Sequence, residues 1–464
     1  MKFRTTLILL AIFIMLLGVV LLLEHRSEKA QEKKEAAEKL TDFKASEVEK
    51  LSLKKEDGSI ITLKKDDQGH WQIVEPLVAE ADEYEANSLA ENFASLRLDK
   101  VVEDRTDNLA AYEIPRKEVS LWLKGQNQPV VIQIGMENPL DSSLYARRTD
   151  RQQVVLLPSH LKYSLDKKVF DLRKKDVLKF ETAKVLSIEL KSKDISWKVR
   201  KEGETWQFIQ PLVALASKYQ VDNLLDSLSG LRAKDFLAED KDQEKLRQYG
   251  LDNPEFTVIL GLQDSQELIF SINRKDNKVV ATNSLARKII EVDSQIATDL
   301  GKKVDDLREK KVASFNSWEA VGIGLKKEGW QLAAVKEKVK EKGQEQEKWF
   351  LTGADGKKEP ADESKIESLL RKLEYLEAAE FIDKPADLKE YGLDRPSLEV
   401  TIKVKPAEKE EREIRLLVGK ENTEKQQVVV KNRDWPYLFR VSSDFLKEMP
   451  TKLEDWQSGS TGKK

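Results

Sequence analysis

The chain has 464 residues and no cysteine, and 35% of its residues are charged and 40% hydrophobic. This length predicts about three domains, and the hydrophobic content is sufficient for packed cores. Lys and Arg (80) nearly balance Asp and Glu (83), which argues against a nucleic-acid-binding protein, and the lack of cysteine excludes disulfides, thiolate metal sites and a cysteine nucleophile.

The amino terminus has the pattern of a membrane anchor. Lys2 and Arg4 precede an uncharged run from Thr5 to Leu23, which is long enough, as a helix rising about 1.5 Å per residue, to cross a bilayer. A cleaved signal peptide would have a shorter apolar stretch and a small-residue cleavage site, but this run ends in "VLLLEH". We therefore predict a cytoplasmic tip and transmembrane anchor over 1–23. The Glu- and Lys-rich residues 24–45 predict a charged helical stalk.

Three similar segments follow one another along the rest of the chain. They begin at Trp71, Trp206 and Trp349. In each segment, apolar residues recur at offsets of 0, 3, 4, 7 and 10, a spacing that predicts an amphipathic helix packed on a core. We predict three homologous modules over residues 46–181, 182–316 and 317–456, followed by a flexible tail over 457–464.

The starts and ends of the predicted helices repeat as well. The N-cap candidates are Asp82, Ser217 and Asp362, and the first two begin capping-box patterns. The stretches "LRQYGLDNP" and "LKEYGLDRP" predict helix ends, in which Gly takes the left-handed position, Leu makes an apolar contact and Pro stops the helix. These residues are Tyr249, Gly250, Leu251 and Pro254 in the second copy and Tyr391, Gly392, Leu393 and Pro396 in the third. The first copy has Tyr112 and Pro115 in "YEIP" without the glycine, so we expect a different end there.

Alternating β-branched segments surround each predicted helix. Examples are "EVSLWLKG", "EFTVILGL" and "SLEVTIKV", and this alternation predicts strands. The predicted module is β-β-α-β-β-β-α, with a couple of further short strands. The fold class is therefore α+β: an N-terminal transmembrane helix followed by three tandem α+β modules, each an antiparallel sheet with a packed helix.

A search for catalytic and binding patterns predicts no reactive site. The three histidines, His25, His70 and His160, lie at non-equivalent places and show no metal-ligand spacing. The Gly-rich stretches lack the spacing of phosphate-binding loops, and no pair of carboxylates is singled out. We predict no catalytic residue, cofactor or metal site. The repeated tryptophans favour core anchors over the alternative of a platform for stacking on polysaccharide.

The tandem architecture, the "W-x-(I/L)-x-x-P" openings and the "YGLD-x-P" ends together resemble a bacterial family known as domain of unknown function 4340. The resemblance covers nearly all of residues 45–456. It implies a membrane segment, here Leu7–Leu23, and an accessory role beside an ABC transporter of the gliding-motility kind. Basic residues lie on both sides of the predicted span, so their count does not fix its orientation. With the resemblance, we expect the body outside the cytoplasm, on the bacterial inner membrane.

The first functional hypothesis is a non-enzymatic, single-pass envelope protein that serves an ABC-type transporter or gliding-like machinery as accessory or scaffold. One alternative is an envelope glycan-binding protein or glycan-acting enzyme. Another alternative is a membrane scaffold that faces the cytoplasm. The expected partners are the membrane and a protein, with a glycan as the alternative and no nucleic acid.

Overall fold

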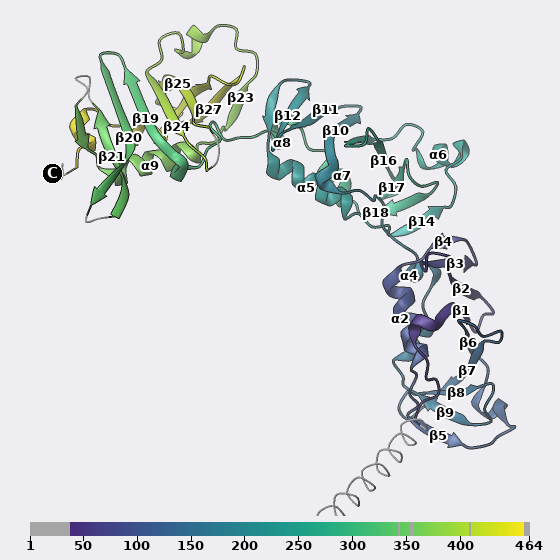
Figure 1. Cartoon of the computed structure of the whole chain (residues 1–464). Coiled ribbons are helices and arrows are strands. Elements are labelled where there is room, and N and C mark those ends of the chain that lie inside the picture. Colours follow the sequence, from purple (N-terminus) through teal and green to yellow (C-terminus); the bar gives the residue numbers. More distant parts are fainter. Residues whose placement is uncertain (1–37, 342–343, 353–356, 408–409, 459–464) are drawn as a thin grey trace, which may run out of the picture. The chain divides into compact units, whose positions relative to one another are not determined.

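The computed structural model describes residues 38–341, 344–352, 357–407 and 410–458. The predicted anchor, most of the predicted stalk and most of the predicted tail lie outside these residues. Within them, no helix combines the length and apolar character that a membrane crossing requires. The chain divides into two compact units, one up to Lys175 and one from Asp176 onward, and each is described separately (Figure 1).

The first unit contains one module. Its strands are β1 (Val48–Lys54), β2 (Ile60–Lys65), β3 (Trp71–Glu75), β4 (Ala79–Glu80), β5 (Lys100–Glu103), β6 (Lys117–Leu123), β7 (Val130–Glu137), β8 (Leu144–Arg148) and β9 (Val154–Leu157). Its α-helices are α2 (Glu83–Ala94), α3 (Leu161–Leu165) and α4 (Val169–Leu172), and its 3₁₀ helices are η1 (Ala45–Glu47) and η2 (Leu109–Tyr112).

The second unit contains two further modules of the same design. The strands of the second module are β10 (Val185–Ser192), β11 (Ser196–Glu202), β12 (Thr205–Gln210), β13 (Ala214–Ala216), β14 (Asp235–Ala238), β15 (Phe256–Leu262), β16 (Glu267–Lys275), β17 (Lys278–Asn283) and β18 (Ile289–Val292). Its helices are η3 (Thr182–Lys184), α5 (Lys218–Ser229), α6 (Gln243–Tyr249), α7 (Gln295–Leu300) and α8 (Val304–Leu307).

The third module repeats this order. Its strands are β19 (Ala320–Lys327), β20 (Trp330–Glu341), β21 (Gln344–Thr352), β22 (Lys358–Pro360), β23 (Glu380–Ile382), β24 (Leu398–Val404), β25 (Arg412–Asn422), β26 (Gln427–Asn432) and β27 (Leu438–Ser442). Its helices are η4 (Ser317–Glu319), α9 (Glu363–Glu374), η5 (Leu388–Tyr391), η6 (Ser443–Glu448) and η7 (Leu453–Trp456).

Each module is built on a nine-stranded antiparallel sheet. In the first module the strand order is β4-β3-β2-β1-β6-β7-β8-β9-β5, and the other two sheets have the equivalent order. From the central strand β1 the chain runs outward through β2 and β3 to β4 at one edge. After α2 it forms β5 at the opposite edge, and β6 then returns to pair beside β1. The module is therefore mostly β, with more strands than the predicted β-β-α-β-β-β-α unit. The extra strands include β4 and β13, of two and three residues, which are too short to show an alternating pattern.

The apolar residues of the long helices fill the cores as the spacing predicts. Ala86, Leu89, Ala90 and Phe93 of α2 are fully buried, and the equivalent residues of α5 and α9 are at most 2% exposed. In β1 the buried residues alternate with more exposed ones, as expected for a sheet with one face on a core. Most buried apolar residues of the first module form one cluster, and most of those of the second and third modules form a single shared cluster.

Candidate functional site at the joint between modules two and three

The three repeated tryptophans are core residues. Trp71, Trp206 and Trp349 are 1%, 2% and 2% exposed. A lysine lies over each indole ring, with Nζ 4.8, 6.0 and 5.2 Å from the ring centroid for Lys65, Lys201 and Lys336. Because these rings are covered by protein, they offer no face on which a sugar could stack.

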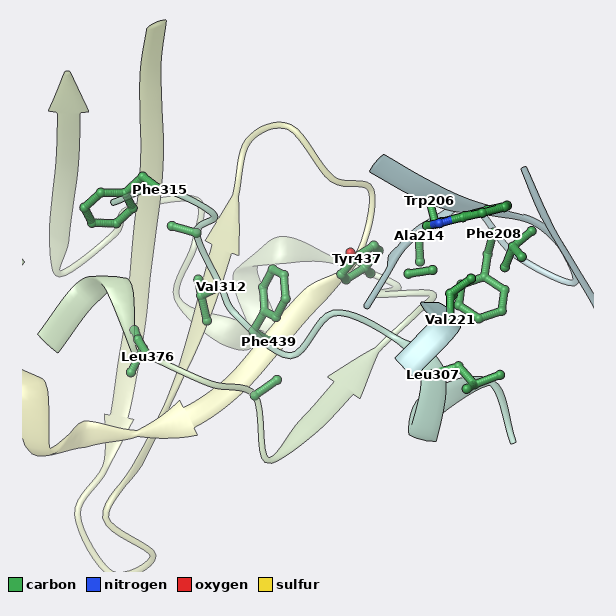
Figure 2. Packing of buried hydrophobic residues seen from close by; sticks show 14 of the residues in the cluster. Trp206, Phe208, Ala214, Val221, Leu307, Val312, Phe315, Leu376, Tyr437 and Phe439 are labelled. Carbon is green, nitrogen blue, oxygen red and sulfur yellow. The ribbon is translucent and has the colours of Figure 1, made fainter. Parts of the chain in front are cut away.

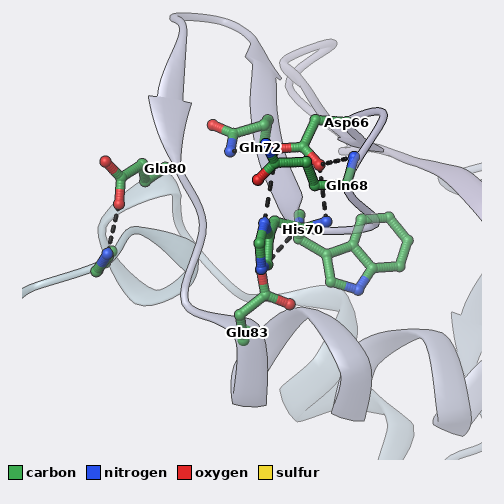
Figure 3. A network of polar contacts seen from close by, with 8 residues as sticks. Asp66, Gln68, His70, Gln72, Glu80 and Glu83 are labelled. Atoms are coloured by element: carbon green, nitrogen blue, oxygen red, sulfur yellow. Dashed lines mark hydrogen bonds and ion pairs between the residues drawn. The ribbon is translucent and has the colours of Figure 1, made fainter.

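The turn before Trp71 shows how this position joins sheet to helix (Figure 3). The Asp66 carboxylate accepts hydrogen bonds from the backbone N–H groups of Gln68 and His70, both at 2.9 Å. These bonds, the one from His70 first, lower the pKa of Asp66. The backbone N–H of Trp71 donates to Glu83 of α2 at 2.8 Å, and its indole Nε1 donates to Asn87 at 2.8 Å. His70 therefore lies in a structural turn.

The predicted N-cap residues stand directly before the long helices, but they do not all act alike. Asp82 accepts from the Glu85 backbone N–H at 3.2 Å, and Asp362 accepts from that of Lys365 at 3.4 Å. Ser217 has the extended backbone of an N-cap and makes no side-chain capping bond. A carboxylate at this position thus caps the first and third helices, while the second relies on its backbone.

The repeated helix ends adopt the left-handed conformation expected for glycine. Gly250 and Gly392 have φ of 69° and 66°, and the following leucines, Leu251 and Leu393, are buried in small apolar clusters. Pro254 and Pro396 follow and lead into β15 and β24. The end of the first copy differs in part, as expected: Glu113 takes the same left-handed conformation with φ of 54°, but Pro115 comes directly after Ile114. The Glu113 N–H donates to Ala110 O at 3.1 Å, as the Gly250 N–H donates to Arg247 O at 3.1 Å.

The backbone carbonyl oxygen of the tyrosine at each of these ends contacts a residue of the sheet. A Cβ on Gly135 would stand 2.1 Å from the Tyr112 oxygen, and one on Gly419 would stand 2.0 Å from the Tyr391 oxygen. In the second module, Asn273 instead donates its side-chain amide to the Tyr249 oxygen at 3.1 Å. The sequence search missed these partners, although the glycines that end "PVVIQIG" and "EIRLLVG" were visible. Pro115 follows a cis peptide bond in the first copy.

The segment between modules two and three is hydrogen-bonded on both sides. Toward the second module, Ser217 N–H donates to Leu307 O at 2.8 Å and Glu309 N–H donates to Leu215 O at 2.9 Å. Toward the third module, Ala378 N–H donates to Lys310 O at 2.8 Å, and Val312 N–H donates to Leu376 O at 2.9 Å. Most of the connection between the modules is therefore hydrogen-bonded to one module or the other. We call residues 307–312 the joint.

Arg308 lies at the centre of the joint with its side chain fully buried. Its guanidinium carbon lies 3.7 Å from the ring centroid of Phe381 and 4.4 Å from that of Tyr437. Its Nη1 donates to Asp383 at 2.7 Å. The residue comes from the second module and all three of these partners from the third, so a single cation connects the two modules.

Apolar packing also connects the second and third modules (Figure 2). Side chains of the second module, such as Leu307, and of the third, such as Phe439, belong to one cluster, and Tyr437 lies between the two groups. Burial raises the pKa of Tyr437, and the nearby Arg308 charge opposes that rise. Two atoms of Arg308, Nε and Nη2, are buried without a hydrogen-bond partner among the described residues.

Sequence reasoning did not identify Arg308. The available signal was its repetition: Arg173 ends the first module in "VFDLRKK" as Arg308 ends the second in "VDDLREK". Arg173 is also buried, at 3% exposed. The backbone of each arginine forms an isolated β-bridge with the alanine before the N-cap of its own module, Ala81 for Arg173 and Ala216 for Arg308. In the third module Gln457 forms the equivalent β-bridge with Ala361. An arginine is thus present at this position in the two modules that another module follows.

Nothing in the described residues forms a site for a metal ion: no group of three or more His, Asp or Glu side chains is arranged to hold one. No curated protein matches the chain. Among solved structures, two from Pseudomonas aeruginosa align at 10% identity over 74% of this chain and 90% of theirs. They are a DNA polymerase sliding clamp with ligand and the DNA polymerase III subunit beta, with TM-scores of 0.13 and 0.12, which are too low to support any argument from them.

One family model matches the chain three times, over residues 71–246, 206–385 and 349–461. The matches begin at the three repeated tryptophans. The first two run past the end of one module into the next. The chain therefore belongs to the family described as Domain of unknown function (DUF4340).

Proposed function

We propose that this chain is a non-enzymatic envelope protein whose modules form a spacer and docking body for a membrane transporter. The joint carries the proposal, because Arg308 and the backbone hydrogen bonds of Lys310 and Val312 connect the second module directly to the third. The repeated residues support it, since they fill cores, cap helices and shape helix ends. A scaffold needs such fixed spacing between surfaces, whereas an enzyme needs converging reactive groups.

The membrane attachment and the partner rest on the sequence. The uncharged run from Thr5 to Leu23 would anchor the chain, and the family resemblance implies an ABC transporter on the same membrane. The body would then stand on the extracytoplasmic side of the bacterial inner membrane. Protease added to spheroplasts tests this orientation: digestion of the modules is expected, and protection until lysis would favour the scaffold that faces the cytoplasm.

Co-purification of the full chain in mild detergent tests the partner. Transporter subunits are expected to co-purify with the wild-type protein. Arg308→Ala should release a partner that contacts both modules, whereas Arg274→Ala, which removes a cation that is 55% exposed and pairs with Glu255, should not. Recovery of no transporter or envelope protein with the wild-type chain would contradict the proposal.

A further inference from the structure

The third module has an open cleft of about 340 Å³ where η4 meets the end of α9. Two exposed aromatic residues line it: Trp318 of η4 is 70% exposed, and Tyr375 at the end of α9 is 66% exposed. Large exposed aromatic side chains that share one cleft are uncommon on a soluble surface and mark binding sites. This cleft is separate from the joint contacts of Arg308.

Contacts between η4 and α9 hold the two sides of the aromatic cleft together. Glu374 is 4% exposed, and its carboxylate accepts a hydrogen bond from the Ser317 backbone N–H at 3.1 Å. This bond ties the last turn of α9 to the turn that carries Trp318. Lys311 places its Nζ 4.9 Å from the centroid of the Tyr375 ring. The turn that carries Trp318 and the helix end that carries Tyr375 are thus held together.

The other two modules have the same backbone elements without the aromatic residues. The middle residue of the 3₁₀ helix is Ser46 in η1 and Ala183 in η3, where η4 has Trp318. The residue after the long helix is Ser95 in the first module and Gly230 in the second, where the third has Tyr375. Since the fold forms without these rings in two modules, packing of the module does not account for their presence in the third.

The polar side chains of the cleft indicate the class of ligand. Lys336 and Arg371 contribute two positive charges, and Glu367 and Glu374 contribute two negative charges, so the lining favours neither an anion nor a cation. It offers hydrogen-bond donors and acceptors beside aromatic faces. A sugar ring matches both features, because its hydroxyl groups donate and accept and its C–H faces pack on aromatic rings. The volume lies near the lower end of small-ligand pockets, about 300–1,000 Å³.

We propose that this cleft binds one or two units of a neutral oligosaccharide. The binding is independent of the scaffold role and would attach the third module to envelope glycan. Contacts with two aromatic rings in an open cleft are typical of weak binding. We expect a Kd of about 0.1–10 mM, which corresponds to roughly −3 to −5.5 kcal/mol.

The test uses the full chain in a detergent without a sugar headgroup. The probes are chitotriose, cellotriose and maltotriose. Their binding is detected by saturation-transfer NMR and measured by titration. At least one trisaccharide is expected to bind, and Trp318→Ala and Tyr375→Ala should each weaken its binding at least tenfold. Tyr84→Ala and Tyr219→Ala, which truncate tyrosines that are 79% and 70% exposed in the other modules, should leave binding unchanged. Thermal melting checks that each variant is folded.

Three results would overturn the proposal. The first is that none of the three sugars binds the wild-type chain. The second is that binding occurs equally well in the folded Trp318→Ala variant. Binding of a proline-rich peptide that depends on Trp318, without sugar binding, would also overturn the ligand class and assign the cleft to a protein partner.

Discussion

Arg308→Ala is the sharpest perturbation of the joint. It removes a buried cation that contacts two aromatic rings and donates to Asp383. A desolvated cation–π contact contributes about 2 kcal/mol, and breaking a buried ion pair costs about 3–5 kcal/mol. The Asp383 side chain is 38% exposed, so water reduces the second effect. We expect the joint to lose about 2–4 kcal/mol against local opening.

Hydrogen exchange measures this opening at the joint itself. The amides of Val312 and Ala378 are bonded between the joint and the third module, and both should exchange faster in the variant. A loss of about 2–4 kcal/mol corresponds to roughly 30- to 700-fold faster exchange, at about tenfold per 1.4 kcal/mol. The amides within the module sheets should change much less.

Two control variants separate the ring contacts from charge alone. Arg308→Lys keeps the charge but loses the planar guanidinium, so it should restore only part of the protection. Arg274→Ala removes an exposed ion pair, which contributes about 0–1 kcal/mol, and should leave the joint amides unchanged. Joint amides that exchange within threefold of wild type in Arg308→Ala would refute the reasoning.

Three further predictions follow from the helix ends and from Tyr437. Gly250→Ala should destabilise the second module by about 1–3 kcal/mol in chemical denaturation, because φ is 69° and the new Cβ would stand 2.3 Å from the Asn273 amide nitrogen; an unchanged midpoint would contradict this. Glu113→Gly should stabilise the first module by up to about 1 kcal/mol, because glycine adopts the left-handed conformation of this position without the steric cost of a Cβ. A lower denaturation midpoint would count against it. Burial raises the pKa of Tyr437 above 10.0, so the neutral phenol favours the closed joint. That contribution is complete below about pH 10 and is lost as pH rises through the higher pKa of the closed state. Tyr437→Phe should remove this part of the alkaline weakening, as measured by the distance between labels on the two modules, and an identical pH profile in the variant would exclude the phenol as its cause.

Much of the module could be predicted from the sequence, because repetition reduces ambiguity. The ladder of α9, from Ile366 to Leu373, is fully buried, and the spacing alone predicts that face. The glycines of the helix ends were also predictable, since few other residues adopt positive φ. Glu113 shows the limit of this argument: its backbone is held by the same bonds, so the fold imposes the conformation on an unfavourable residue.

The joint could not be predicted because its partners are distant in sequence. Arg308 lies more than 70 residues before Phe381 and about 130 before Tyr437, and no local pattern relates them. An arginine in a charged stretch is usually exposed, and burial becomes evident only when the next module covers it. The aromatic cleft has the same origin, since Trp318 and Tyr375 become neighbours only through the packing of η4 on α9.

The most direct test of the fixed joint is a distance distribution between modules two and three. The chain has no cysteine, so Lys193→Cys and Glu424→Cys introduce one spin-label site in each module at exposed positions. Electron-spin distance measurements on the full chain should give one narrow distribution, which broadens when Arg308→Ala is added. A broad distribution before that change, or one that the change leaves narrow, would contradict the account.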